Sequence, residues 1–201
     1  MNRFFLLLLL CLVPLASVCR DFNGGILAGL TATQVDGDGH GGYDKLGIVA
    51  GIWVGRSIND NLSVVGELRY IQKGSYSREV SNGILYGFYR MQLHYSEIPV
   101  YVRYQFRPRT YASAGLSMGY LWKAREENEL GSLPEERIAM FRKLEPAARV
   151  GIEYGFTPRW SAVAFFSYSL YPIRPHTGDI TYRFNFGQTN SVIELYARYS
   201  F

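Results

Sequence analysis

Every second side chain is apolar from Ile193 to the final residue, Phe201, and the positions between them include Glu194 and Arg198. Successive side chains of a β-strand point to opposite faces, so this pattern predicts a strand with one apolar face and one charged face. The same alternation recurs in seven earlier segments, which are 22–34, 45–58, 62–73, 96–106, 111–124, 147–156 and 160–170. Aromatic residues make up 15% of the chain, which is typical of a β-rich protein. We therefore predict eight strands.

The connections between these segments alternate between short and long. The short ones contain Asn, Asp or Pro, which favour tight turns, and they lie at 59–61, 107–110 and 157–159. The long ones lie at 35–44, 75–92, 125–145 and 172–190. An even number of strands with short turns on one side and long loops on the other is the layout of a bacterial outer-membrane barrel. We therefore predict an all-β fold, an eight-stranded antiparallel up-and-down transmembrane β-barrel with short periplasmic turns and four longer extracellular loops.

Three segments depart from the regular pattern. Asn82-Gly83 is a strong signal for a two-residue hairpin, so the third and fourth strands are expected to extend above the membrane and meet there. A β-bulge in 90–95 would switch the faces of that segment, and its face assignment therefore stays open. Residues 180–186 also alternate, and we interpret them as the extramembrane start of the eighth strand.

The N-terminus has the pattern of a secretory signal peptide, because Arg3 is followed by about a dozen apolar residues. This run is shorter than the roughly 20 residues that a membrane-spanning helix needs. We favour cleavage before Arg20, with cleavage after Ala16 as the alternative. The prediction is a cleaved signal peptide, residues 1–19, followed by one barrel domain, residues 20–201. Cleavage before Arg20 removes both cysteines of the chain and with them any disulfide or thiolate metal site.

The apolar faces of the strands point either outward to lipid or inward, as in a soluble lipocalin-like barrel. Three features favour the outward orientation. The middle of the apolar face carries no charge, and Arg56, the nearest exception, lies close to a predicted periplasmic turn. Aromatic side chains of this face gather at the two strand ends, as in the interfacial girdles of membrane barrels. The opposite face carries acids and arginines at similar depths, where they can pair inside a narrow barrel; they are Glu67, Arg69, Glu97, Arg103, Arg149, Glu153, Glu194 and Arg198.

We predict that this lumen charge network is structural. Buried charges must be paired, and a paired polar interior replaces the apolar core that a membrane barrel lacks. An ion or proton path is the alternative role. No catalytic residue, cofactor or metal site is predicted. The nearest match to a calcium loop, residues 36–40, lacks two ligands of that pattern and is interpreted as flexible. The charged stretch 125–143 is interpreted as a solvated loop, partly helical.

His94 and Ser96 lie two residues apart and therefore share one face of a strand. Such a pair resembles the arrangement in outer-membrane lipid A deacylases, in which the His activates the Ser for attack on an acyl ester. Those enzymes also need a carboxylate to orient the His, and none is evident on the same face. The favoured interpretation of His94 is therefore a side chain at the interfacial level of the membrane.

Several partners are expected. A last strand that ends on an aromatic residue resembles the signal read by the barrel-assembly machinery, and Tyr199 and Phe201 would carry that signal. Outer-membrane lipids and lipopolysaccharide would surround the barrel, and a secretion-system or envelope protein is a further candidate partner. We expect a monomer. A net charge of +4 with scattered basic residues argues against nucleic-acid binding.

Three stretches of the chain, 43–47, 67–74 and 95–104, resemble the PorT-type outer-membrane β-barrel domain of Bacteroidota. The resemblance covers the whole mature chain and implies an eight-stranded barrel in the cell outer membrane. The founding member of that family belongs to the type IX protein secretion system, so a role in secretion is one implication. The family has no catalytic residues to transfer. The leading hypothesis is a non-enzymatic barrel, and the alternatives are a lipid-modifying hydrolase that uses His94 and Ser96, or a small pore.

Overall fold

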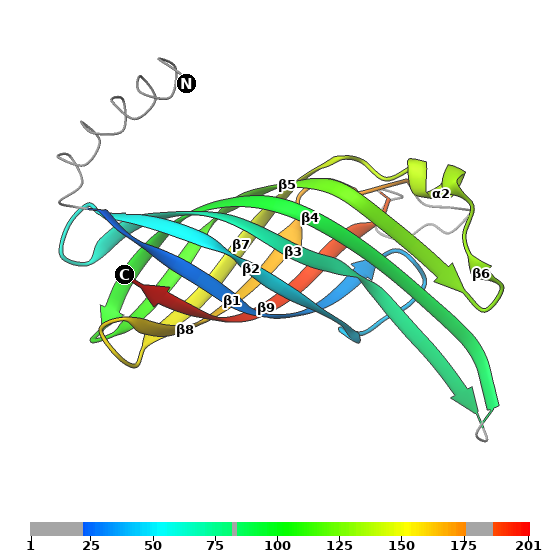
Figure 1. Cartoon of the computed structure of the whole chain (residues 1–201), viewed down its shortest axis with the longest axis horizontal. Helices are drawn as coiled ribbons and strands as arrows, with labels where there is room; N and C mark the ends of the chain where they lie inside the picture. The colour runs from blue at the N-terminus through cyan, green and yellow to red at the C-terminus, as the bar shows by residue number, and fades with distance from the viewer. Residues whose placement is uncertain (1–21, 82–83, 176–186) are drawn as a thin grey trace, which may run out of the picture.

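The computed structural model describes residues 22–81, 84–175 and 187–201, and the predicted signal peptide lies outside these residues. The described residues form eight long strands, the two-residue strand β6 and a short helix (Figure 1). Their bounds are β1 Phe22–Asp36, β2 Lys45–Ser57, β3 Leu62–Ser81, β4 Ile84–Arg107, β5 Thr110–Asn128, β6 Gly131–Ser132, α2 Glu135–Ala139, β7 Leu144–Gly155, β8 Trp160–Ser169 and β9 Thr189–Ser200.

The long strands close into a ring. Neighbouring strands follow the order β4-β3-β2-β1-β9-β8-β7-β5, and β4 also pairs with β5. Every pairing in the ring is antiparallel, including the one between β1 and β9, the first and last strands. No long strand is left with an unpaired edge, which is what a sheet in lipid requires because water cannot satisfy its backbone groups there. The predicted eight-stranded antiparallel barrel is confirmed.

The three short turns lie where the sequence predicts them, between β2 and β3, between β4 and β5, and between β7 and β8. The long connections lie at the opposite end of the barrel (Figure 1). Much of the predicted loop 75–92 is strand, since β3 runs to Ser81, β4 starts at Ile84 and these two residues pair. This hairpin projects beyond the rest of the barrel (Figure 1), as expected from Asn82-Gly83. The predicted partly helical loop after residue 125 continues β5 to Asn128 and contains α2. The predicted strand start at 180–186 lies outside the described residues.

Within the membrane section of the barrel the apolar residues of the predicted lipid face do point outward. Leu30, Leu116 and Leu195, on three different strands, are 60%, 60% and 62% exposed. The aromatic side chains predicted to form girdles are also exposed near the strand ends. Examples are Tyr104 at the periplasmic end and Tyr120 toward the extracellular end. The charged residues of the same strands are buried on the inner face. This distribution fits a barrel surrounded by lipid, in which apolar side chains contact the acyl chains and the polar side chains of the lumen pair with one another.

From the level of the outer girdle to the extracellular end the same strands reverse this polarity. Met91 and Leu93 of β4 point inward and are fully buried, whereas their neighbours Gln92 and His94 lie on the outer face. Other apolar residues of this level are likewise buried; they are Val35, Ile71, Leu121, Phe141, Ile173 and Val192. The extracellular section therefore has an apolar core and a polar surface, as a water-soluble barrel does, because water replaces lipid around it. The faces of 90–95, which the sequence leaves open, are settled here, since the register shift opposite His94 and Tyr95 leaves β4 alternating without interruption.

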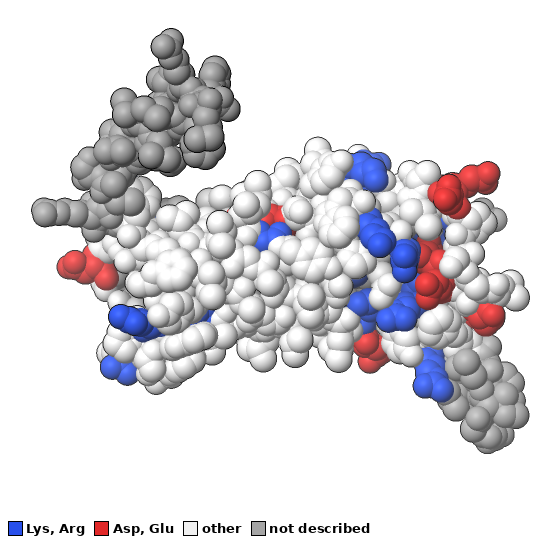
Figure 2. All heavy atoms as spheres, in the orientation of Figure 1, with Lys and Arg blue, Asp and Glu red and all other residues white. Residues whose placement is uncertain are grey.

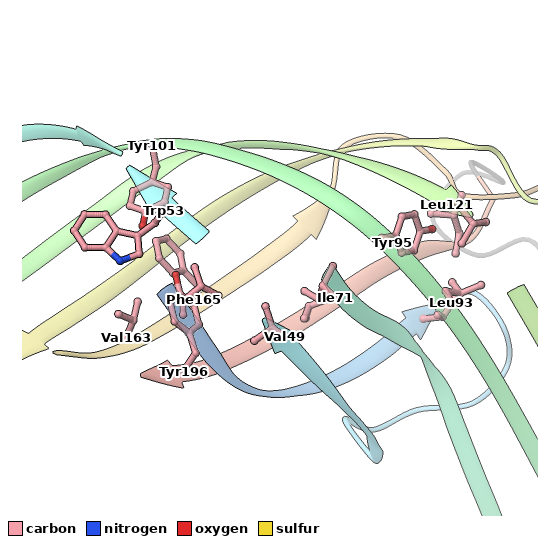
Figure 3. Close-up of a cluster of buried hydrophobic side chains, with 14 of the residues drawn as sticks. Val49, Trp53, Ile71, Leu93, Tyr95, Tyr101, Leu121, Val163, Phe165 and Tyr196 are labelled. Atoms are coloured by element: carbon pink, nitrogen blue, oxygen red, sulfur yellow. The ribbon is translucent and has the colours of Figure 1, made fainter. Parts of the chain in front are cut away.

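The interior also holds aromatic side chains in the membrane section, which the sequence pattern does not reveal. Tyr101 packs edge-on against Phe165 with ring centroids 5.0 Å apart, and Phe165 stacks with Tyr196 at 6.4 Å. Trp53 lies beside Tyr101 in the same group (Figure 3). Space for these rings comes partly from inward-facing glycines. An added Cβ at Gly115 would lie 2.4 Å from Cβ of Tyr101, and one at Gly151 would lie 2.6 Å from a ring carbon of Phe165, so no side chain fits at either position.

Candidate functional site

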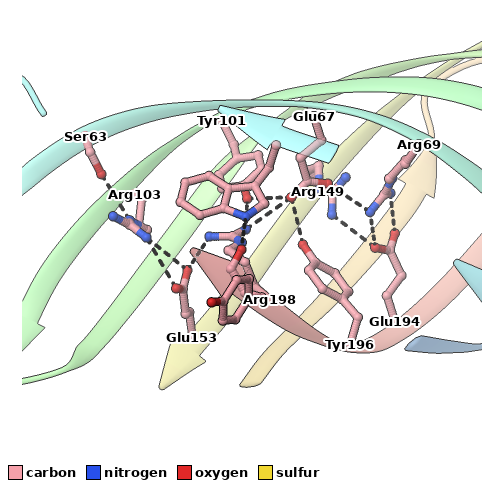
Figure 4. Close-up of polar contacts among 12 residues, drawn as sticks. Ser63, Glu67, Arg69, Tyr101, Arg103, Arg149, Glu153, Glu194, Tyr196 and Arg198 are labelled. Carbon is pink, nitrogen blue, oxygen red and sulfur yellow. Dashed lines mark hydrogen bonds and ion pairs between the residues drawn. The ribbon is translucent and has the colours of Figure 1, made fainter. Parts of the chain in front are cut away.

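The centre of the barrel is occupied by a cluster of ion pairs around Arg69 of β3 (Figure 4). Its guanidinium donates to both carboxylate oxygens of Glu194, at 2.7 and 2.9 Å, and to Oε2 of Glu97, at 2.9 Å from Nε. Its Nη1 also lies 3.3 Å from Oε2 of Glu67. Arg149 donates from Nη2 to Glu194 at 3.1 Å. These five residues are 0 to 3% exposed, and we call them the central cluster.

A second group of ion pairs lies toward the periplasmic end. Arg198 of β9 donates to Glu153 at 2.7 Å and to Glu67 at 3.1 Å, so it connects this group to the central cluster. Arg103 contacts both oxygens of Glu153, at 3.3 and 3.4 Å, and donates to Oγ of Ser63 at 3.0 Å. With the central cluster, these contacts bring together all eight residues that the sequence assigns to the lumen. Whether their role is purely structural stays a prediction.

Two buried tyrosines tie the charges to the aromatic group. The hydroxyls of Tyr101 and Tyr196 donate to the same oxygen of Glu67, at 2.7 and 3.0 Å, and Arg198 contacts the hydroxyl of Tyr101. The guanidinium of Arg149 lies 4.0 Å from the ring centre of Phe165. Cationic groups thus contact aromatic faces as well as carboxylates, a favourable arrangement for a desolvated charge.

A third group lies toward the extracellular end, and the sequence analysis missed it. Lys73 donates to Glu97 at 2.9 Å and to Glu145 at 3.2 Å. Glu145 in turn accepts hydrogen bonds from Ser169 and Asn190. Lys73 lies on the polar face of the predicted third strand, and this position alone indicates a lumen residue. Glu145 falls in a predicted loop, where the sequence defines no face.

The three groups together therefore hold five acids and five bases inside the barrel. The acids are Glu67, Glu97, Glu145, Glu153 and Glu194, and the bases are Arg69, Lys73, Arg103, Arg149 and Arg198. Each contacts at least one opposite charge. A desolvated charge is costly alone but tolerable when paired and hydrogen-bonded, so the arrangement favours a closed, rigid interior.

A further buried arginine, Arg174 from the segment between β8 and β9, lies at the extracellular end of the barrel. It forms a bidentate pair with Glu126 of β5, at 2.6 and 2.8 Å, and donates to Gln188 at 2.5 Å. Tyr89 of β4 donates to Glu126 at 2.6 Å, and the Arg174 guanidinium lies 4.4 Å from the ring centre of Phe141. We call these five residues the mouth clamp. The mouth clamp is not evident from the sequence, because all five of its residues lie in segments predicted as loops, 75–92, 125–145 and 172–190.

The mouth clamp lies on the extracellular side of the outer girdle. Its residue Glu126, for example, follows the girdle residue Trp122 by four positions on β5. Burial alone would raise the pKa of the Glu126 carboxyl, but hydrogen bonds from Arg174 and Tyr89 and the positive charge of Arg174 lower that pKa below its usual value. The carboxylate is therefore charged at neutral pH, and the ion pair with Arg174 is formed.

A cavity of about 430 Å³ lies beside the mouth clamp. Its lining is mostly polar and includes Asp38, His40, Glu129, Arg137 and Arg174. His40 stacks on Tyr89 with ring centroids 4.4 Å apart, and its backbone N–H donates to Asp38 at 2.8 Å. The segment 36–40, interpreted as flexible, thus contacts the extracellular section. Among the described residues no group of three or more His, Cys, Asp or Glu is arranged to hold a metal ion.

His94 and Ser96 share one face of β4, as the sequence predicts, and the structure shows that this is the outer face. Nδ1 of His94 forms a hydrogen bond of 2.7 Å with the hydroxyl of Tyr70. The imidazole also packs against Trp122, with ring centroids 5.4 Å apart. A phenol therefore occupies the position at which a catalytic carboxylate would orient the imidazole. The contacts match those of a histidine among the aromatic side chains of the outer girdle.

The chain was compared with known proteins. A family model described as "Outer membrane protein beta-barrel domain" matches residues 4–201. Neisserial surface protein A (NspA) has a similar structure, with 13% identity over 90% of this chain and 97% of that protein and a TM-score of 0.56. Ail, the attachment invasion locus protein of Yersinia pestis, shares 17% identity over 90% of this chain and all of that protein, with a TM-score of 0.50. No curated protein sequence matches the chain. Among the described residues, no helix is long and apolar enough to cross a membrane.

Proposed function

The chain belongs to the outer membrane protein beta-barrel domain family, and on that premise we propose that it is a non-enzymatic barrel with a closed lumen that acts through its extracellular end. The filled interior is the observation that carries this proposal. Three groups of ion pairs and a group of aromatic rings follow one another along the barrel, and the mouth clamp lies above them. Such an interior leaves the outer surface and the loops as the parts available to partners.

Conductance separates a closed barrel from a small pore. The purified full chain, reconstituted in planar lipid bilayers, is expected to show no channel events above the background of protein-free membranes. A matched variant, Tyr101→Ala with Phe165→Ala, removes two rings from the aromatic group without changing any charge, and it is expected to increase ion leakage. Regular single-channel steps from the unaltered protein would contradict the proposal.

A rim of exposed basic residues surrounds part of the extracellular section. Figure 2 shows basic side chains gathered above the middle of the barrel, toward the end that carries α2 and the β3–β4 hairpin. The exposed members are Arg78, Arg90, Lys123, Arg125, Arg142 and Lys143, and we call them the basic rim. It begins directly above Trp122 of the outer girdle, the depth at which the phosphates of outer-leaflet lipids lie.

The basic rim supports lipopolysaccharide as a partner, because clustered cations at a membrane surface attract anionic headgroups by about 1 kcal/mol each. The test is co-purification of lipopolysaccharide with the protein. Replacing Lys123, Arg125 and Arg142 with Gln is expected to reduce the retained lipopolysaccharide several-fold. The matched control replaces three exposed arginines of the periplasmic turns, Arg107, Arg109 and Arg159, with Gln and is expected to have no effect. Equal losses in both variants would reject this partner.

The β3–β4 hairpin supports a protein partner, since it projects furthest from the barrel (Figure 1). The resemblance to the PorT-type domain suggests a partner from a secretion system. Chemical cross-linking in native membranes, compared between the full chain and a variant in which residues 78–87 are replaced by a short Gly-Ser turn, tests this role. Loss of a cross-linked secretion component in the shortened variant would support it, and an unchanged cross-linking pattern would count against it.

A further inference from the structure

The outer surface of the barrel carries a single arginine among apolar side chains near the periplasmic end of β2. Arg56 is exposed, and β-sheet pairing places it directly between Phe22 of β1 and Val64 of β3. Its guanidinium lies 5.5 Å from the ring centre of Phe22. None of the described carboxylates forms an ion pair with it. Within the described part of the chain this positive charge is therefore not neutralised, and the side chain faces the surroundings of the barrel.

A groove extends from Arg56 toward the middle of the membrane. It has a volume of about 560 Å³ and is lined mainly by apolar residues and glycines. Pairing aligns Val54 with Gly66 of β3, one step deeper in the membrane than Arg56. Gly66 lies on the outer face between Val64 and Leu68, and a Cβ added there would meet no atom within 4 Å. The missing side chain thus leaves a hollow in the lipid-facing surface.

The position of Arg56 matches the polar boundary of the periplasmic leaflet. It lies two residues before Ile58, where the short turn to β3 begins, and at the end of the barrel that carries Tyr104, Phe106 and Phe156. A cation on the lipid face costs about 2–4 kcal/mol at the bilayer midplane but nearly nothing near an interface. At this depth the groups that face an outward side chain are the phosphates and upper acyl chains of phospholipids.

We propose that Arg56 and the groove over Gly66 form a binding site for one phospholipid of the periplasmic leaflet. The guanidinium binds the phosphodiester, since an arginine fork matches the geometry of two phosphate oxygens. One acyl chain lies in the groove beside Val54 and over Gly66. Charge and depth favour a lipid over a second protein, because the groove opens to the bilayer and ends on a cation with which none of the described carboxylates pairs. The site lies at the opposite end of the barrel from the surfaces proposed above and does not depend on them.

Native mass spectrometry of the full chain, released from nanodiscs of phosphatidylethanolamine and phosphatidylglycerol, tests the site. The unaltered protein is expected to retain one phospholipid. Arg56→Gln removes the charge and keeps the size of the groove, and Gly66→Leu fills the groove and keeps the charge. Arg56→Gln is expected to reduce the retained fraction by about tenfold, the change produced by losing one hydrogen bond to a charged group. Gly66→Leu is expected to reduce it by about the same factor, because the acyl chain loses its place in the groove.

Two matched controls make the result specific. Arg107→Gln removes another exposed arginine at the periplasmic end, and Ala114→Leu enlarges another outward-facing residue, on β5. Both are expected to retain the lipid, and all variants must show the gel mobility shift of a folded barrel. Retention unchanged in Arg56→Gln and Gly66→Leu would overturn the proposal. Equal loss in Arg107→Gln, or a dimer that dissociates in Gly66→Leu, would also overturn it, since the latter would assign the groove to a second copy.

Discussion

Arg69 and Glu194 form a bidentate ion pair at the centre of the barrel, with Nη1 2.7 Å from Oε2 and Nη2 2.9 Å from Oε1. The two residues are 125 positions apart in the chain. Arg69 belongs to β3 and Glu194 to β9, and β2 and β1 lie between these strands in the sheet. The contact therefore crosses the lumen. It can form only when the ring is closed and the strand registers are correct, so it connects the folding of the barrel to the stability of its interior.

Removing the charge of Glu194 is expected to be costly unless Arg149 is removed with it. Glu194→Gln leaves Arg69 and Arg149 short of one counter-charge and is expected to lower the free energy of unfolding by about 3–5 kcal/mol. Glu194→Gln combined with Arg149→Gln restores the charge balance and is expected to cost less than the sum of the two single changes. Urea unfolding in lipid vesicles measures the free energy of unfolding of Glu194→Gln, of Arg149→Gln and of the double variant. Ser167→Ala, which deletes only a 3.3 Å hydrogen bond to Glu194, is the control, and additive costs would contradict the prediction.

Replacing Ser96 is expected to leave lipid A unchanged. The His94 imidazole is engaged by the Tyr70 hydroxyl at 2.7 Å and by the Trp122 ring, and a serine nucleophile needs a base that a carboxylate orients. Mass spectrometry of lipid A from cells that express the unaltered chain, Ser96→Ala or His94→Gln is the measurement. A change in acylation that appears with the unaltered protein and disappears in both variants would establish the hydrolase alternative.

Replacing the last residue is expected to impair assembly more than stability. Phe201 is 83% exposed, so its removal takes away little packing within the barrel. If Tyr199 and Phe201 form the signal for the assembly machinery, Phe201→Ala lowers the amount of folded protein in the outer membrane of cells several-fold. The same variant refolded in vesicles should unfold within about 0.5 kcal/mol of the unaltered chain. Phe156→Ala, which removes an exposed aromatic side chain at the same end, is the control and should assemble normally.

Acid is expected to release the mouth clamp. The pKa of Glu126 is lowered in the folded protein, so its contribution to stability is complete above the unfolded value of about 4.3 and disappears as the pH falls through the lower folded value. Ile173 donates its backbone N–H to Gln188 at 2.7 Å next to Arg174, so its amide resonance reports on the clamp. Lowering the pH from neutral toward 3 should shift this resonance. In Glu126→Gln the clamp charge is absent, and the same titration should leave the resonance unchanged.

The strands and their faces follow from sequence because they depend on local geometry. Consecutive side chains of a strand alternate between two faces, so apolar residues such as Leu116 and Leu195 reveal the outer face wherever lipid surrounds the barrel. The three tight turns follow for the same reason, since Asn, Asp and Pro set the backbone of a few residues. The alternation no longer identifies the outer face where water replaces lipid around the strands. The extensions of β3, β4 and β5 above the membrane have apolar residues on the inner face instead of the outer face. A search for lipid-facing alternation therefore predicts them as loops.

The eight lumen charges are recognisable from the sequence, but their partners are not. The alternation places Arg69 and Glu194 inside, and only the strand order, the register and the tilt of the closed barrel decide that they meet. The same closure selects Lys73 and Glu145 as partners across the lumen and assembles the mouth clamp from Tyr89, Glu126 and Arg174. These contacts join residues far apart in the chain, and a period-two pattern contains no information about distance across a ring. Local alternation thus determined the barrel and its orientation, whereas ring closure decided which charges pair and which residues form the mouth clamp.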